Sequence, residues 1–167
     1  MKNKSKKVAF LGVITSIALV LSYLEAMLPP IYAAIPGIKV GLPNIVIVFI
    51  LYRFGLKEAM MVSLLRVFIV ALLFGNVMTL SYSLVGALLS VLLMALFKKI
   101  DAFSTVGVSI IGGVSHNLGQ IIVAIFLLNS TQIGYYMIVL AFTGTLAGVF
   151  IGLAGAILIK RLKSIKI

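Results

Sequence analysis

Residues 35–53 read IPGIKVGLPNIVIVFILYR. A break containing two prolines and two glycines leads into an apolar run that covers about 43–55. As a helix, a run of this length rises only about 20 Å, whereas the hydrocarbon core of a bilayer is about 30 Å thick. If the chain spans a membrane, the preceding break must supply the remaining depth.

Composition predicts a membrane protein. Of the 167 residues, 63% are hydrophobic and 10% are charged, and mean hydropathy is +1.30. A soluble domain is about one quarter charged, so this chain has too little polar surface to cover a water-soluble globule. We expect one integral membrane domain over 1–167.

Charge and composition exclude several functions. The net charge of +11 is divided among short clusters between apolar runs, whereas a nucleic-acid binder gathers its basic residues into one stripe. The absence of Cys excludes disulfide and thiolate chemistry. One His and three acidic residues are very few ligands for a metal, and we expect neither a metal nor a cofactor.

Apolar segments predict an all-α bundle of six transmembrane helices. They cover about 8–28, 43–55, 57–74, 79–97, 106–128 and 135–159. The basic start followed by an apolar run resembles a signal peptide, but the run continues to about 28 without a small-residue cleavage site. We therefore interpret 8–28 as a retained first helix.

Basic residues predict the orientation of the bundle. With six spans, all of the 14 Lys and Arg residues except Lys39 and Arg66 fall on one side of the membrane. This asymmetry places both termini in the cytoplasm and the loops 29–42, 75–78 and 129–134 outside. An alternative is that the basic clusters recognise lipid or nucleic acid.

Small residues mark packing faces. The last segment carries Gly144, Gly148, Gly152 and Ala156 at intervals of four, and such faces let helices approach closely in a bilayer. The first segment has two faces. Small residues form one face, which could dock a partner protein, and a more polar face is expected to look into the bundle. The first consists of Ala9, Gly12 and Ser16, and the second of Thr15, Ala18, Ser22 and Glu25.

Two charged residues lie within apolar segments. Arg66 is in the middle of the third segment, and Glu25 is toward the outer end of the first. Because a charge in hydrocarbon costs several kcal/mol, each is a candidate functional residue. Arg66 either pairs with Glu25 or with backbone carbonyls, or it faces an outward cavity and meets an anionic or carbonyl-rich ligand.

The fifth segment contains a polar sector. His116 and Gln120 are i, i+4 neighbours with Asn117 beside them, and Gly112 and Gly113 lie one turn below and leave room. Such groups need hydrogen-bond partners in an apolar helix. They either form an interhelical network or bind a ligand.

The opening break is expected to line the same outer mouth. Irregular backbone is tolerated at membrane depth where it lines a cavity, so we expect residues 33–42 to act as a lid. Pro43 suits a first helical turn, which puts Asn44 at a helix N-terminus where free N–H groups favour an anion or a carbonyl oxygen. Lys39 either attracts ligand or is a solvated loop lysine.

Four stretches carry a family resemblance: PGIKVGLPN, LLRVFI, SLVGALLS and GGVSHNLGQ. Over nearly the whole chain they resemble the Gx transporter family, which is also called heptaprenyl diphosphate synthase component I. That family is similar in turn to the substrate-binding S components of energy-coupling factor (ECF) transporters.

The resemblance implies a bacterial cell-membrane protein that captures a small vitamin- or cofactor-like molecule from outside. It also implies two kinds of partner, a transmembrane coupling subunit and two cytoplasmic ATPases. S components dock through an Ala-x-x-x-Ala face on the first helix, whereas this chain has Gly12 and Ser16 at that spacing. Metal-specific S components have a His-rich N-terminal entry, and this chain starts MKNK.

Two other functions compete with transport. One is a membrane accessory or regulatory subunit of a prenyl diphosphate synthase. The chain is not expected to be an enzyme itself, because prenyl transfer needs several aspartates to hold magnesium and diphosphate and Asp101 is its single Asp. The other is a structural or electron-transfer membrane partner that binds no ligand.

Overall fold

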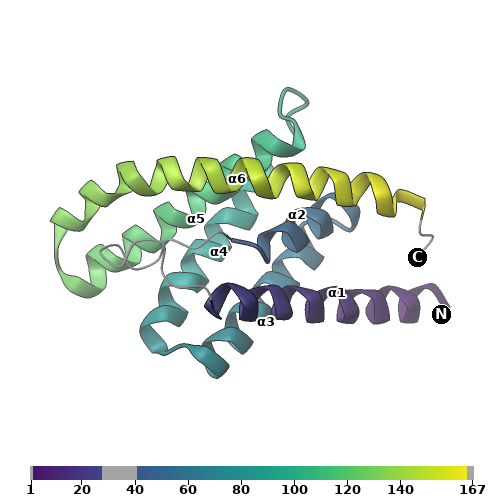
Figure 1. Ribbon diagram of the computed structural model, residues 1–167, viewed down its shortest axis with the longest axis horizontal. Coiled ribbons are helices and arrows are strands. Elements are labelled where there is room, and N and C mark those ends of the chain that lie inside the picture. The colour runs from purple at the N-terminus through teal and green to yellow at the C-terminus, as the bar shows by residue number, and fades with distance from the viewer. Residues whose placement is uncertain (1, 28–40, 165–167) are drawn as a thin grey trace.

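Six α-helices match the six apolar segments. The structure is a computed structural model that describes residues 2–27 and 41–164, and within these residues it contains helices and no strand (Figure 1). The helices are α1 (Lys2–Met27), α2 (Asn44–Arg53), α3 (Leu56–Phe74), α4 (Val77–Phe97), α5 (Thr105–Leu128), the short 3-10 helix η1 (Thr131–Tyr135), α6 (Tyr136–Arg161) and the 3-10 turn η2 (Leu162–Ser164).

The shortest α-helix is the hub of the core. All residues of α2 from Val46 to Leu51 are buried, and they pack with apolar residues of the other five α-helices. A helix that is apolar on every face is stable only when it is surrounded by other elements. Figure 1 shows α2 between the long helices α1 and α6.

Caps define where two helices begin. Asn76 and Thr79 form a capping box at the start of α4, in which each side chain accepts a hydrogen bond from the other residue's backbone N–H. The Ser104 hydroxyl accepts a hydrogen bond from the Gly107 N–H at the start of α5. These side chains satisfy N–H groups that have no partner within their helix.

The small-residue face of α6 packs against α5. A Cβ added at Gly148 would lie 2.5 Å from the Ile110 Cα, and one added at Gly152 would lie 2.6 Å from the Val106 Cα. Helix α5 also packs closely against α4: a Cβ at Gly119 would lie 2.8 Å from the Gly86 Cα. The glycines therefore set the spacing of the α4–α5–α6 layer.

Several basic residues lie at one end of the bundle and contact neighbouring helices there. Lys7 forms an ion pair with Glu58 and so joins α1 to the start of α3. Lys98 Nζ donates to the Leu51 carbonyl oxygen at 2.7 Å and joins the end of α4 to the end of α2. The start of α1 and the end of α6 also lie at one end of the molecule (Figure 1). This arrangement agrees with basic residues sharing one side, and their cytoplasmic placement stays a prediction.

Four helices in the described residues are long and apolar enough to cross a membrane: α1, α4, α5, and η1 continued by α6. This is typical of a multi-pass membrane protein. Helix α3 has sufficient length, but it carries Lys57, Glu58 and Arg66. Helix α2 is too short, with 10 residues. Six spans therefore stay a prediction.

Candidate ligand-binding cavity

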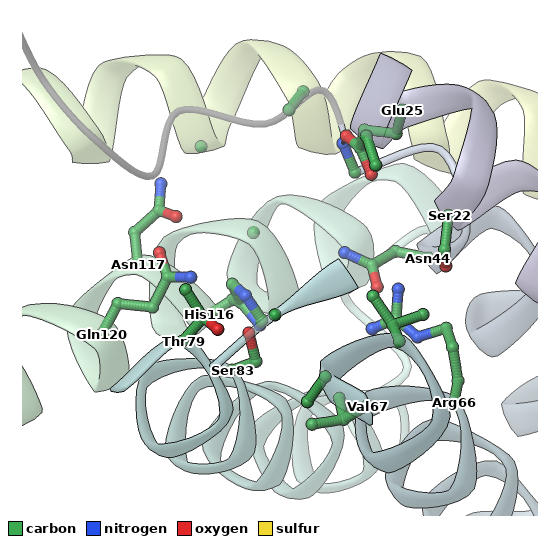
Figure 2. A pocket seen from close by; sticks show the side chains of 18 of the residues that line it. Ser22, Glu25, Asn44, Arg66, Val67, Thr79, Ser83, His116, Asn117 and Gln120 are labelled. Atoms are coloured by element: carbon green, nitrogen blue, oxygen red, sulfur yellow. Dashed lines mark hydrogen bonds between the residues drawn. The ribbon is translucent and has the colours of Figure 1, made fainter. Parts of the chain in front are cut away.

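A cavity of about 170 Å³ lies where α1 and α3 end and where α2 and α4 begin (Figure 2). All six α-helices contribute to its lining. Six of the seven residues predicted to bind substrate line it, namely Glu25, Asn44, Arg66, His116, Asn117 and Gln120. The seventh, Lys39, lies outside the described residues, as does most of the proposed lid over 33–42.

One wall of the cavity carries both charged residues. Glu25 comes from α1, Asn44 from α2 and Arg66 from α3, and Figure 2 shows the Asn44 amide between the other two side chains. Glu25 Oε1 accepts a hydrogen bond from the Gly41 N–H. This bond ties the end of α1 to the turn that precedes α2.

The Arg66 guanidinium has no hydrogen-bond partner among the described residues. Only 9% of Arg66 is exposed, and its Nε is buried without a partner. Within the same residues no ion pair joins Arg66 to Glu25, because the single ion pair found there is Lys7–Glu58. Arg66 lines the cavity; that the cavity faces outward and that Arg66 meets a ligand there stay predictions.

The prediction that the start of α2 has free N–H groups is wrong. The N–H groups of Asn44, Ile45 and Val46 donate to the carbonyl oxygens of the three residues 41–43. These tight turns occupy the donors that an anion would need. Donors to a ligand on this wall must therefore come from side chains, chiefly Asn44 and Arg66.

The facing wall is the polar sector of α5. His116, Asn117 and Gln120 all line the cavity (Figure 2). Asn117 Nδ2 donates to the Leu140 carbonyl oxygen of α6 at 2.7 Å, so part of the expected interhelical network exists beside the cavity. The His116 ring lies against Gly86 of α4, where a Cβ would be 3.0 Å from Cε1.

The glycines of α5 do not leave the room that the sequence suggested. A Cβ at Gly112 would lie 2.5 Å from the Met94 sulfur, and one at Gly113 would overlap the Gly144 backbone. These positions are filled by neighbouring helices because small residues allow close approach. The cavity lies farther along α5, although Gly113 and Gly144 reach its edge.

Sequence reasoning missed several polar lining residues: Thr79 and Ser83 of α4 and Thr143 of α6. Thr79 and Ser83 are i, i+4 neighbours, so their spacing was a usable signal for a shared face. The inward face of α1 was found, since Thr15, Ala18 and Ser22 are buried. Ser22 also lines the cavity.

A model of one protein family matches residues 14–158, and its description is heptaprenyl diphosphate synthase component I. The chain belongs to this family. Every residue lining the cavity falls within the matched range. The family name links the chain to a component of a heptaprenyl diphosphate synthase. Neither a curated protein nor a solved structure matches the chain.

The residues predicted to dock a partner lie on the surface of the protein. Ala9, Gly12 and Ser16 are exposed on α1, and a Cβ at Gly12 would meet no atom within 4 Å. They face away from the cavity-lining side of the helix. In the described residues no cluster of three or more His, Cys, Asp or Glu could hold a metal ion.

Proposed function

We propose that the protein is the substrate-capture subunit of an ECF-type importer in a bacterial cell membrane. The cavity supports this proposal, because a buried Arg66 that forms no hydrogen bond or direct ion pair within the described residues lines it together with other polar side chains. A desolvated charge without a hydrogen-bonded partner is costly. A ligand that meets it would offset that cost, so the cavity is suited to binding.

In this proposal other subunits supply the energy. The chain contains no G-x-x-x-x-G-K-[ST] motif for ATP, so a transmembrane coupling subunit and two cytoplasmic ATPases would drive transport. The exposed face of Ala9, Gly12 and Ser16 is the proposed docking site. The protein itself is proposed to catalyse no reaction.

A small molecule that stays bound to the protein during purification would test the proposed capture function. The protein would be purified in detergent, small molecules extracted from it identified by mass spectrometry, and each added back while the melting temperature is measured. We expect one compound to raise the melting temperature, and Arg66→Ala and Asn117→Ala to remove the effect. Arg161→Ala, at an exposed arginine outside the cavity, is the matched control and should keep it.

Docking has a separate test. Gly12→Leu adds bulk to the exposed face of α1, so we expect it to abolish copurification of the coupling subunit and ATPases while ligand binding stays intact. Loss of both properties would indicate misfolding. Unchanged copurification would contradict docking at this face.

The family name favours a second candidate, an accessory or regulatory membrane subunit of a prenyl diphosphate synthase. Catalysis would belong to a separate synthase, because Asp101 is the single Asp of this chain. If a prenyl synthase copurifies with the protein and no small molecule raises its melting temperature, this candidate replaces the importer.

A further inference from the structure

We propose that the cavity binds a small zwitterion, with the acidic group of the ligand against Arg66 and its basic group against Glu25. This inference rests on the capture function proposed above and names the chemical class of the substrate. It follows from two side chains of opposite charge that share one cavity and form no direct ion pair with each other, nor with any other described residue.

Arg66 requires an acidic or strongly accepting partner. The side chain lines the cavity, is nine-tenths buried, and makes no hydrogen bond or ion pair among the described residues. Guanidinium groups present parallel N–H donors that match the two oxygens of a carboxylate. The Asn44 amide lies next to Arg66 (Figure 2) and can extend the same donor set.

Glu25 lies on the same wall and is available to a basic group. Its Oε1 accepts the Gly41 N–H, and no cation of the described residues pairs with it. The carboxylate can accept further hydrogen bonds, because an ionised carboxylate has about four acceptor sites. A direct Glu25–Arg66 ion pair would have satisfied both groups. The described residues contain no such pair, so one charge of each sign lines the cavity and can contact a ligand.

Charge balance separates a zwitterion from a simple anion. The described lining contains one cationic and one anionic side chain, Arg66 and Glu25. An anionic ligand would satisfy Arg66 but place a second negative charge near Glu25, which is unfavourable in a low-dielectric site. A zwitterion gives each side chain a partner of opposite sign and adds no net charge.

The facing wall and the cavity volume limit the rest of the ligand. His116, Asn117 and Gln120 present imidazole and amide groups opposite the charged wall (Figure 2), so the other end of the ligand should be polar and uncharged. A cavity of ~150 Å³ holds one benzene molecule, and this cavity has about 170 Å³. The described part of the cavity therefore fits a compact molecule, about the size of one ring with its charged groups.

Two matched sets of three compounds test the charge requirement in thermal shift and calorimetry. The first is L-serine, ethanolamine and 3-hydroxypropionate. The second is L-histidine, histamine and 3-(imidazol-4-yl)propionate. Each set keeps one polar end and presents it as a zwitterion, a cation and an anion. We expect the zwitterion of at least one set to bind tightest.

Substitutions test which side chain binds which charged group of the ligand. Glu25→Gln preserves shape and an acceptor for the Gly41 N–H. It should weaken the zwitterion about tenfold or more and strengthen the anion, because it removes the carboxylate that repels a second negative charge. Glu58→Gln, whose carboxylate pairs with Lys7 outside the cavity, is the matched control and should change neither. Arg66→Gln should weaken the zwitterion and the anion alike.

The compound retained on purification separates this inference from the capture function. A retained molecule with both an acidic and a basic group supports both proposals. If the retained molecule carries charge of one sign or none, the zwitterion proposal is overturned while capture stands. Equal binding of anion and zwitterion, or no shift with any of the six compounds and no zwitterion retained, also overturns it.

Discussion

Among single residues, Arg66 is the one on which the proposed ligand binding depends most. An arginine at this burial normally has a hydrogen-bonded counter-charge, yet its Nε has no partner within the described residues. The sequence located the charge within an apolar helix. Only the packed structure placed it on a cavity wall with Asn44 and opposite His116.

Arg66→Met should stabilise the ligand-free protein. The change removes an unsatisfied buried polar group and keeps a long apolar stem, so we expect the free energy of unfolding to rise by about 1 kcal/mol. Thermal melts in a single detergent would measure this. Arg161→Met, at the exposed end of α6, should have little effect, and a clear loss of stability at Arg66 would mean that its charge is satisfied in the native protein.

At the element scale, close approach of glycine-bearing helices fixes the shape of the bundle. Helix α5 meets α6 at Gly148 and Gly152 and meets α4 at Gly86 and Gly119. These contacts hold the polar sector of α5 opposite the charged wall. The short helix α2 does the same for Asn44, because its burial by the other helices fixes the position of its first turn.

Gly148→Ala should destabilise the protein by about 1–3 kcal/mol, because the added methyl group would meet the Ile110 backbone, which cannot move aside as a side chain can. Gly12→Ala is the matched control. Gly12 has open space around it, and alanine is the better helix former by about 1 kcal/mol. We expect this control to keep or raise the melting temperature; a similar loss at both glycines would argue against the α5–α6 contact.

At the scale of the whole molecule, charge distribution predicts orientation. The end of the bundle that holds Lys7 and Lys98 should face the cytoplasm, and the cavity lies toward the opposite end of α1 and α3. This arrangement would open the cavity to the outside. It follows from the excess of Lys and Arg in cytoplasmic loops of membrane proteins.

Single cysteines would test that orientation, because the natural chain has none. A membrane-impermeant maleimide added to intact cells should label Val77→Cys and Gln132→Cys, at exposed positions near the predicted outer loops. Lys6→Cys and Lys163→Cys should react only after the cells are permeabilised. If these two cysteines were labelled in intact cells, the predicted orientation would be contradicted.

What the sequence determined by itself was local. Apolar runs predicted six helices, spacing separated the inward face of α1 from its exposed small-residue face, and isolated polar residues marked six positions of the cavity. These properties follow from helical periodicity and from the cost of a polar group in hydrocarbon.

Tertiary structure alone decided which of these local features meet. In the part of the chain that the structure describes, it left Arg66 and Glu25 in one cavity without a direct ion pair and occupied the first N–H groups of α2. It also filled the space beside Gly112 with Met94 and brought Thr79 to the cavity lining. Spacing along one helix cannot predict such outcomes, because they depend on how closely different helices approach and at what rotation.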